Sequence, residues 1–389
     1  MLVLFIFFTT LILYSLFEYH RHQRYRKQIP KIIHVNGTRG KSSVTRLIAS
    51  GLRAGGLKIV AKTTGSAPRI ILENGNEIPI ARFFGANIKE QLKIVEFASK
   101  RNIDVLVLEC MAVTPEYQWI TEQKMLHSEV GVITNIRLDH LDLMGPGMKN
   151  VTYSICNTIP TNSTAFTSEK KLFPVMEKIA KKRNTTIHYC NPNEIANEDI
   201  EDFPFIEHKE NVSLSLDVCE NCGIDRKIAL SAMKKTNPDI GATRIYNMNI
   251  NGKIIYFVHS FAANDPESTK YIVDYIKNLH PNIDHFGLVL NTRADRMYRS
   301  KQLIQMLTDV AFDRLFLIGE ESSSIKSFAL RHKIDGNKIE EMGWTRGDEL
   351  MSKVNQLEDK TVLLIGIGNI GGNGGMIVDY FKEQHRKTL

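Results

Sequence analysis

The stretch HVNGTRGKSS at residues 34–43 constrains the fold of this chain more than any other segment. It follows the short β-rich run KIIHV (31–35) and precedes SSVTRLIASGLRAGG (42–56), which has helical spacing of apolar residues and ends at a Gly-Gly pair. A strand, a loop ending in Gly-Lys-Ser and a helix form a phosphate-binding P-loop, because backbone N–H groups and the helix N-terminus surround the phosphates. The loop departs from G-x-x-x-x-G-K-[ST] at Val35, which replaces the first glycine. The segment predicts a nucleotide site in an α/β domain.

The P-loop predicts which side chains act on the phosphates. Lys41 neutralises the β/γ oxygens, and the Ser42 hydroxyl ligates Mg²⁺. The apolar run IDVLVLE (103–109) ends in Glu109, where nucleotide-hydrolysing enzymes carry a carboxylate near Mg²⁺ or the attacking group. A lone glutamate at a strand end is more often only a polar terminus, but beside a P-loop Glu109 is predicted to belong to the metal site.

A third polar loop, TNIRLDHLDLMG (134–145), follows the predicted strand EVGVITN (129–135). It brings oxygen ligands and one imidazole to the carboxyl end of a strand, where α/β folds place their sites: Asn135, Asp139, His140 and Asp142. The alternative is a turn with capping carboxylates and a solvated histidine.

The rest of the chain has the alternating pattern of parallel α/β sheets. Further apolar runs, each separated from the next by enough chain for a helix, are KIIYFVH (253–259), FGLVLN (286–291), RLFLIG (314–319) and TVLLIG (361–366). A length of 389 residues suits two domains, with a boundary around NLHPNID. We expect a central domain over 31–284 and a smaller C-terminal α/β domain over 285–389.

The N-terminus predicts a membrane anchor. Residues 1–17 carry no charged side chain and span roughly 26 Å as a helix, at the short end for a membrane crossing. Basic residues follow, so the predicted anchor (1–19) and basic linker (20–30) leave the body in the cytoplasm by the positive-inside rule. These residues account for five of the net +7 charges and make a nucleic-acid surface improbable: Arg21, Arg24, Arg26, Lys27 and Lys31. An uncleaved signal sequence or a buried core helix is the alternative.

Two smaller motifs have weaker interpretations. The five cysteines form no disulfide framework and indicate a reducing compartment, while the lone pair Cys219 and Cys222 is more typical of a loop or core than of a zinc or redox site. GIGNIG (366–371) fits the dinucleotide fingerprint G-x-G-x-x-G, but only 18 residues follow Gly371, too few for the strand and acidic residue that the fingerprint needs. The glycines either let a loop approach the active cleft or form a tight turn.

Together, GTRGKS, VLEC and TNIRLDHLD resemble, in order and spacing, the ATPase core of the Mur ligase superfamily, a relative of which is folylpolyglutamate synthetase. Weaker matches are GATRIY (241–246), HSFAANDPES (259–268) and NTRADRMYRSKQ (291–302). The superfamily's loop is centred on G-T-x-G-K-[ST], which Gly37 and Thr38 match, so Val35 is no defect. The resemblance implies a P-loop ATPase domain, a smaller Rossmann-like C-terminal α/β domain and one preceding transmembrane helix.

The chain more closely resembles the ligase subunit of poly-γ-glutamate (capsule) synthases, with its N-terminal membrane segment, GTRGKSS loop and GIGNIGG element. This implies an enzyme that joins glutamate units by γ-amide bonds through an acyl phosphate, converting ATP to ADP and phosphate. It also implies a single-pass protein of the bacterial cell membrane that acts on glutamate and the growing polymer with small membrane subunits of a synthase and export complex. The alternatives are another Mur-type acid–amino acid ligase and a membrane-associated P-loop ATPase subunit.

The resemblance also implies the site. The catalytic residues are Lys41, Glu109, His140 and Arg296, and the metal ligands for Mg²⁺ (two ions, with Mn²⁺ as an alternative) are Ser42, Glu109 and His140. The ATP-binding residues are Gly37, Thr38, Arg39, Gly40, Lys41, Ser42, Ser43, Asn135, Arg244, Asn264 and Asp295.

The chain departs from the Mur ligase pattern at three places. SICNTIPTN (154–162) lacks the lysine that many Mur ligases carbamylate to hold a second magnesium, and HSFAANDP has Asn264 and Asp265 but no matching histidine. Arg39 stands where many Mur ligases have asparagine and adds a cation beside the phosphates. KTTGSAP (62–68) is a candidate acceptor-binding loop.

Overall fold

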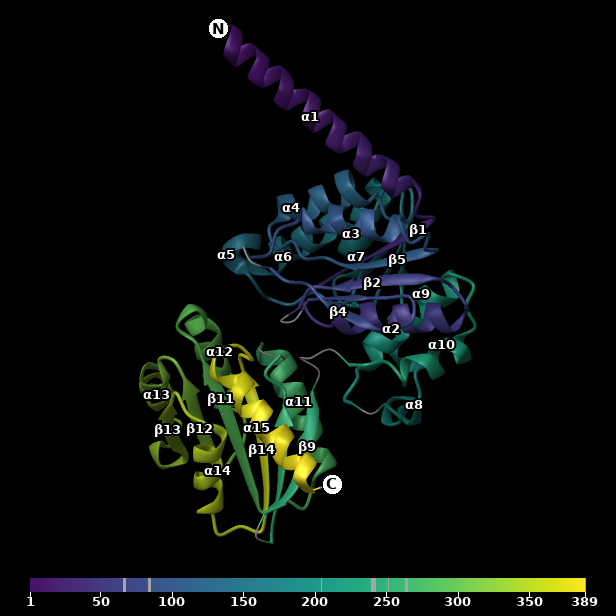
Figure 1. The fold of residues 1–389 in the computed structure, drawn as a ribbon. Helices are drawn as coiled ribbons and strands as arrows, with labels where there is room; N and C mark the ends of the chain where they lie inside the picture. The colour runs from purple at the N-terminus through teal and green to yellow at the C-terminus, as the bar shows by residue number, and fades with distance from the viewer. Residues whose placement is uncertain are drawn as a thin grey trace. The chain divides into compact units, whose positions relative to one another are not determined.

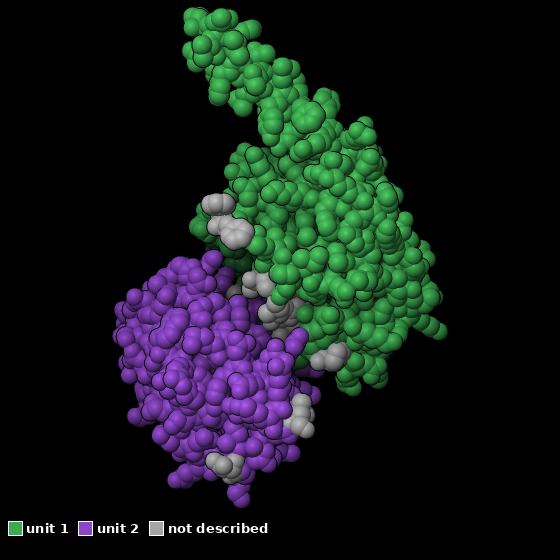
Figure 2. Space-filling view, in the orientation of Figure 1, with its two compact units in different colours: residues 1–239 green, residues 240–389 purple. Residues whose placement is uncertain are grey.

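The computed structural model describes residues 1–65, 68–82, 85–203, 205–238, 243–250, 252–262 and 265–388. The chain divides into two compact units, unit 1 (Met1–Asp239) and unit 2 (Ile240–Leu389), coloured separately in Figure 2. The expected boundary between residues 284 and 285 therefore falls inside unit 2. The physical reason is strand pairing: β10 (Lys253–His259) is bonded in parallel to β14 (Thr361–Gly368), so the polar stretch near 280–286 connects two elements of one unit.

Unit 1 is built on an eight-stranded sheet with the strand order β4-β3-β2-β5-β1-β6-β7-β8 (Figure 1). Its strands are β1 (Lys31–Asn36), β2 (Ile59–Thr63), β3 (Arg69–Ile71), β4 (Glu77–Pro79), β5 (Val105–Glu109), β6 (Val130–Ile133), β7 (Thr164–Thr167) and β8 (Thr186–Tyr189). β1 is paired in parallel with β5 and β6, whereas β3 is antiparallel to β2 and β4. The carboxyl ends of β1, β5 and β6 therefore meet at one edge of the sheet, as the sequence predicted.

Helices cover both faces of this sheet because alternate strand residues point to opposite sides. On one side, Ile33 and Val35 pack with α2 (Lys41–Ala54), α9 (Lys209–Asn221) and α10 (Arg226–Met233). On the other side, Ile32 packs with α3 (Glu90–Ser99) and the π-helix η1 (Thr121–Leu126). The remaining helices of unit 1 are α4 (Pro115–Ile120), α5 (Leu141–Met144), α6 (Gly147–Ile155), η2 (Cys156–Thr158), α7 (Phe173–Lys182), η3 (Pro192–Glu194) and α8 (Asn197–Glu201).

The N-terminal helix α1 (Leu2–Lys27) projects from unit 1 and is long and apolar enough to cross a membrane (Figure 1). The prediction of a linker separate from the helix over residues 20–30 is wrong for residues 20–27, because α1 continues to Lys27. The helix ends shortly before Pro30. Proline lacks the backbone N–H and disfavours helical geometry in the residue before it. The apolar residues of the first turns are exposed, whereas His22 and Arg26 near the C-terminal end of the helix are buried against unit 1.

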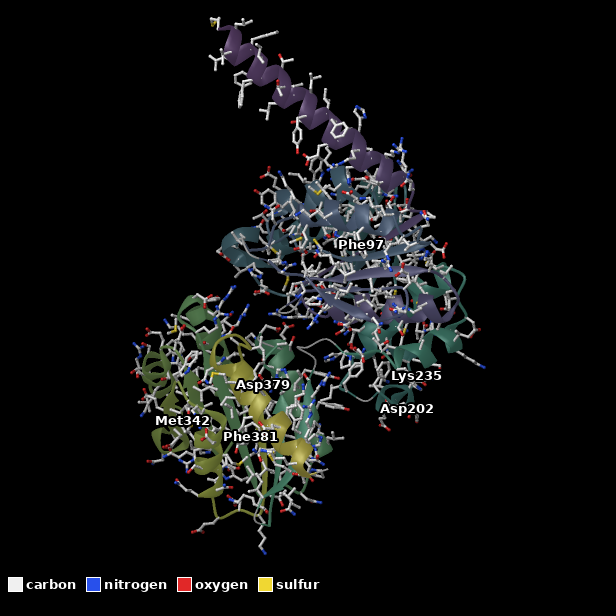
Figure 3. The ribbon with its side chains drawn as sticks, viewed as in Figure 1. Phe97, Asp202, Lys235, Met342, Asp379 and Phe381 are labelled. Atoms are coloured by element: carbon white, nitrogen blue, oxygen red, sulfur yellow. The ribbon has the colours of Figure 1, made fainter. Side chains whose placement is uncertain are left out.

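Unit 2 is a smaller α/β unit with a six-stranded sheet in the order β13-β12-β11-β14-β10-β9. Its other strands are β9 (Arg244–Ile250), β11 (His285–Thr292), β12 (Arg314–Gly319) and β13 (Ile339–Gly343). Its helices are α11 (Pro266–Leu279), η4 (Ala294–Arg296), α12 (Met297–Leu307), α13 (Ser322–Arg331), η5 (Gly336–Lys338), α14 (Gly347–Asn355) and α15 (Asn373–Thr388). Phe381 of α15, labelled in Figure 3, stacks on Phe257 with ring centroids 3.9 Å apart and joins the core.

The two weaker motifs have structural explanations. Cys219 is buried in the unit 1 core, where burial raises the pKa of its thiol, and both Cys219 and Cys222 are free. In GIGNIG, Gly368 has φ +100° and an added Cβ would lie 2.5 Å from the Asn291 carbonyl oxygen, so close packing against β11 requires glycine. GIGNIG spans the end of β14 and the turn that leads to α15.

Candidate functional site

The P-loop lies between β1 and α2, and its two glycines have conformations that only glycine adopts easily. Gly37 has φ +133°, and an added Cβ would lie 2.1 Å from the Thr134 hydroxyl oxygen. Gly40 has φ +79° and is the residue before α2. Val35, in contrast, is a fully buried residue inside β1. The first glycine of the consensus is therefore unnecessary, because this chain is still a regular strand at that position.

The TNIRLDHLD segment holds the P-loop in place. The Thr38 N–H donates to the Asn135 carbonyl oxygen at 2.9 Å, and the Arg39 N–H donates to Asn135 Oδ1 at 3.0 Å. Asn135 Nδ2 in turn donates to the Arg39 carbonyl oxygen at 3.1 Å. The Arg137 N–H donates to Thr38 Oγ1 at 2.9 Å. Asn135 thus orients the backbone of the loop, which is a clearer role than the direct nucleotide contact predicted for it.

The lysine of the P-loop is hydrogen-bonded to backbone carbonyl oxygens of the same loop. Lys41 Nζ donates to the Gly37 carbonyl oxygen at 2.7 Å and to the Thr38 carbonyl oxygen at 3.2 Å. Burial lowers the pKa of this ammonium, and the negative charge of Glu109 opposes that effect. A phosphate placed in the loop would offer Lys41 a stronger, charged acceptor than these neutral carbonyls.

The two predicted metal ligands of α2 and β5 meet at the same edge of the sheet. Ser42 Oγ donates to Glu109 Oε2 at 2.8 Å. The same carboxylate oxygen accepts the Thr64 N–H at 2.7 Å, and the Glu109 carbonyl oxygen accepts Gln91 Nε2 at 3.2 Å. A hydroxyl and a carboxylate this close are oxygen donors of the kind that Mg²⁺ prefers.

The predicted histidine and the unusual arginine meet at one carboxylate. Arg39 Nη1 lies 3.3 Å from Asp139 Oδ2, and His140 Nε2 lies 3.9 Å from the same oxygen. His140 has φ +47°, and its N–H donates to Asp139 Oδ1 at 3.0 Å. The loop therefore brings Arg39, Asp139 and His140 together, as the predicted site requires, and the metal-binding role of His140 stays a prediction.

These groups surround a pocket of about 210 Å³ in unit 1. Its lining includes Asn36, Gly37, Thr38, Arg39, Lys41, Thr64, Gly65, Glu109, Cys110, Met111, Ala112, Val113, Asp139, His140 and Met144. Across the described residues, no group of three or more His, Cys, Asp or Glu side chains forms a complete metal site. Mg²⁺ usually binds through one or two protein ligands together with phosphates and water, so the Ser42 and Glu109 oxygens fit a nucleotide-bound ion.

The remaining predicted residues lie elsewhere. Ser43 is in the first turn of α2. Arg244 begins β9 and both Asp295 and Arg296 lie in η4, all in unit 2, where Asp295 Oδ2 is 2.9 Å from Arg293 Nη2 and 3.7 Å from Arg296 Nε. Asn264 lies outside the described residues. The roles assigned to these residues stay predictions.

Sequence reasoning missed a charged cluster beside this pocket. Lys62 is fully buried in β2, and its Nζ lies 2.7 Å from Glu90 Oε1 and 3.1 Å from Gln91 Oε1. Arg82 Nε and Nη2 bind the same Glu90 carboxylate at 2.8 and 3.0 Å. A lysine within an apolar strand is the signal that could have revealed the cluster.

Comparison with known proteins identifies the family. Residues 35–236 match the Mur ligase middle domain, and residues 245–384 match the poly-gamma-glutamate synthase CapB C-terminal domain. The capsule biosynthesis protein CapB of Bacillus anthracis is 34% identical over 385 residues, which are 96% of this chain and 81% of that protein. This chain belongs to the CapB family of Mur ligases.

Other members and neighbours agree with that assignment. The PGA synthase CapB of Bacillus subtilis (strain 168) is 33% identical over 378 residues, 96% of each chain. E. coli FolC in complex with ADP has a TM-score of 0.73 at 14% identity, covering 95% of this chain and 93% of that one. The Yersinia pestis bifunctional folylpolyglutamate synthase/dihydrofolate synthase complexed with AMPPNP and Mn has a TM-score of 0.69 at 13% identity, covering 93% and 92%. The predicted family and Mur-ligase-like fold are confirmed, and the CapB-family chain is an ATP-dependent amide ligase.

Proposed function

We propose that this CapB-family ligase joins glutamate units through γ-amide bonds, with an acyl phosphate as intermediate and ATP converted to ADP and phosphate. The observation that carries the proposal is the unit 1 pocket, where the P-loop lysine, the Ser42–Glu109 pair and the Asp139–His140 loop lie at one sheet edge. The names of the relatives, a capsule biosynthesis protein and a PGA synthase, supply the substrate class.

The first step brings two anions together. The γ-carboxylate of a glutamate attacks the γ-phosphorus of ATP, and the bond from that phosphorus to the ADP oxygen breaks. Lys41 exchanges its bonds to the Gly37 and Thr38 carbonyls for phosphate oxygens, which neutralises charge where the carboxylate approaches. Backbone N–H groups between Gly37 and Ser42 and the N-terminus of α2 hold the phosphates.

A divalent ion would supply the remaining charge neutralisation as a Lewis acid on the phosphate oxygens. Ser42 and Glu109 would hold Mg²⁺, with Mn²⁺ as the alternative metal, and His140 would hold a second ion. Arg39 adds a further cation to the pocket, where Asp139 orients its guanidinium.

The second step forms the amide. The amine of the incoming glutamate attacks the carbonyl carbon of the acyl phosphate, a tetrahedral intermediate forms, and phosphate leaves as the amine loses its proton. Arg244, Asn264, Asp295 and Arg296 remain predicted contributors, each tested by alanine substitution with the KM for ATP and the rate of amide formation as readouts.

The location and partners are part of the proposal. α1 anchors the chain as a single pass in a bacterial cell membrane with the body in the cytoplasm. The growing poly-γ-glutamate chain and small membrane subunits of a synthase and export complex are the proposed partners.

The proposal is tested with purified full-length protein in detergent or bilayer, given ATP, Mg²⁺ and glutamate. We expect ADP rather than AMP, release that depends on glutamate, and a γ-glutamyl hydroxamate when hydroxylamine replaces the amine. Lys41→Ala should abolish turnover in a folded protein, and Lys178→Ala on the exposed surface of α7 is the matched control. AMP formation contradicts the proposal, and ADP release that is independent of any amino acid supports the simpler P-loop ATPase.

A further inference from the structure

The membrane helix is fixed to unit 1 by side chains near its C-terminal end. His22 Nε2 lies 2.7 Å from the Met125 carbonyl oxygen of η1. Arg26 Nη2 donates to the His127 carbonyl oxygen at 2.7 Å and pairs with Glu129 at 2.5 Å. Both anchoring side chains are more than nine-tenths buried, at 8% and 7% exposure. α1 is therefore a rigid extension of unit 1 and not a tether on a loose linker.

This attachment sets how far unit 1 stands from the bilayer. The uncharged run of α1 ends at Phe17, and His22 follows five residues later. At 1.5 Å per residue the contact with η1 lies about 8 Å beyond the end of the apolar run, and any tilt of the helix shortens that height. The polar headgroup layer is itself roughly 5–8 Å thick on each side. The surface of unit 1 around η1 therefore lies at headgroup level.

The side chains exposed there suit a lipid surface. Lys100 at the end of α3 lies 5.7 Å from the centroid of the Tyr25 ring of α1, and Lys124 of η1 lies 5.2 Å from that of the exposed Trp119 of α4. Together with Arg21 and Arg24 of α1, these side chains form what we call the anchor-side face: Arg21, Arg24, Lys100, Trp119 and Lys124. α3 and α4 lie on the side of unit 1 from which α1 projects (Figure 1).

The charges of the anchor-side face are mostly positive. Glu96 binds Lys100 at 2.6 Å and Glu129 pairs with Arg26, while Glu18 of α1 and Glu116 of α4 are further carboxylates on these elements. The basic side chains of α1, η1 and the end of α3 outnumber these two carboxylates. Arg21, Arg24 and Lys124 have exposed cationic side chains, and Lys124 lies beside the amphipathic side chain of Trp119. Clustered basic residues beside a membrane helix attract anionic lipids, and tryptophan favours the membrane–water interface.

We propose that unit 1 lies against the membrane surface through the anchor-side face, with anionic lipid headgroups as its partner. This inference rests on the proposed membrane insertion of α1. The inference goes beyond insertion, because α1 could be inserted while unit 1 stayed in water without touching the lipid headgroups. The arrangement holds the ATP pocket of unit 1 at a constant height above the bilayer.

The two tryptophans of the chain allow a direct test. In Trp344→Phe, Trp119 is the single reporter, and its fluorescence is recorded in bilayers containing lipids spin-labelled at the headgroup. The control reporter is Lys235→Trp with Trp119→Phe and Trp344→Phe. Lys235, labelled in Figure 3, is exposed and follows α10, which packs on the opposite face of the sheet from α3. Flotation with vesicles reports insertion of α1 separately.

We expect Trp119 to be quenched by headgroup spin labels more strongly in anionic than in zwitterionic bilayers, and the reporter at position 235 to be unaffected. Lys124→Glu should reduce the difference between the two lipids, whereas Lys235→Glu, beyond α10 on the opposite face of the sheet, should not. Protein that floats with vesicles while Trp119 stays unquenched overturns the inference and leaves the face free for a protein subunit. Equal quenching of both reporters overturns it as well. Protein that fails to float refutes the membrane anchoring itself.

Discussion

Substitution of Glu109 by glutamine separates its structural role from its proposed metal role. In the structure Glu109 Oε2 accepts the Ser42 hydroxyl at 2.8 Å and the Thr64 N–H at 2.7 Å. The glutamine carbonyl has the same shape and can accept both bonds. Hydrogen bonds to charged groups contribute about 1.5–3 kcal/mol and neutral ones about 1 kcal/mol, while removal of a buried charge recovers part of the loss. We therefore expect Glu109→Gln to lower the free energy of unfolding by only about 1–2 kcal/mol.

The effect on metal-dependent binding should be larger. Loss of residues that merely support metal ligands costs about 10–100-fold in metal affinity, so loss of a direct ligand should cost at least ~100-fold, or ~2.7 kcal/mol. Calorimetric titration with a non-hydrolysable ATP analogue, with and without Mg²⁺, measures this directly. In Glu109→Gln the gain in affinity from Mg²⁺ should disappear while affinity without metal is retained; Glu177→Gln on exposed α7 is the control. A variant that folds and keeps the full Mg²⁺ gain would refute Glu109 as a ligand.

Three further predictions concern the same region. Gly37→Ala, whose Cβ would lie 2.1 Å from Thr134 Oγ1, should weaken nucleotide binding and cost about 1–3 kcal/mol in unfolding free energy for its backbone conformation alone; calorimetry showing wild-type affinity would contradict this. His34 is fully buried, yet hydrogen bonds with Cys110 and Glu122 outweigh burial and raise its pKa to about 9. Because the folded pKa exceeds the unfolded value of about 6.5, this stabilisation is complete below pH 6.5 and is lost as the pH rises through 9. Urea titrations at several pH values should show the free energy of unfolding falling between pH 6.5 and 9 in the wild type. The fall should be smaller in His34→Gln, and an equal fall in both proteins would contradict the prediction. Arg39→Asn removes a partly exposed cation and should raise the KM for ATP about fivefold, or ~1 kcal/mol, and an unchanged KM would exclude Arg39 from ATP binding.

Local patterns predicted the elements of the fold well. KIIYFVH is β10 over Lys253–His259, IDVLVLE contains β5, and the P-loop lies between β1 and α2 as its strand–loop–helix context required. Buried parallel strands are continuous apolar runs, so they are visible without knowledge of their partners. The meeting of Glu109 with Ser42 was also predictable, because Glu109 ends β5 and Ser42 follows the loop at the carboxyl end of the adjacent parallel strand β1.

The predictions that failed concern features that depend on contacts between residues distant in the chain. The domain boundary was misplaced because β10 pairs with β14, which lies about a hundred residues later, and nothing near residue 253 reveals that pairing. Likewise, Lys62 is recognisable as part of a charged cluster only once folding brings Glu90 to it. The docking of α1 is a further case, because His22 and Arg26 bind the backbone carbonyls of Met125 and His127, about a hundred residues later in the chain.

The central claim, that the γ-carboxylate of glutamate is activated by phosphorylation in this pocket, is tested most directly by isotope transfer. Full-length protein is incubated with ATP, Mg²⁺ and glutamate whose γ-carboxylate is labelled with ¹⁸O, and the phosphate released is analysed by mass spectrometry. An acyl phosphate leaves one carboxylate oxygen on phosphorus when the amine displaces phosphate, so the account predicts one ¹⁸O in each phosphate formed per amide bond. Phosphate without label, or label found in AMP, would contradict it.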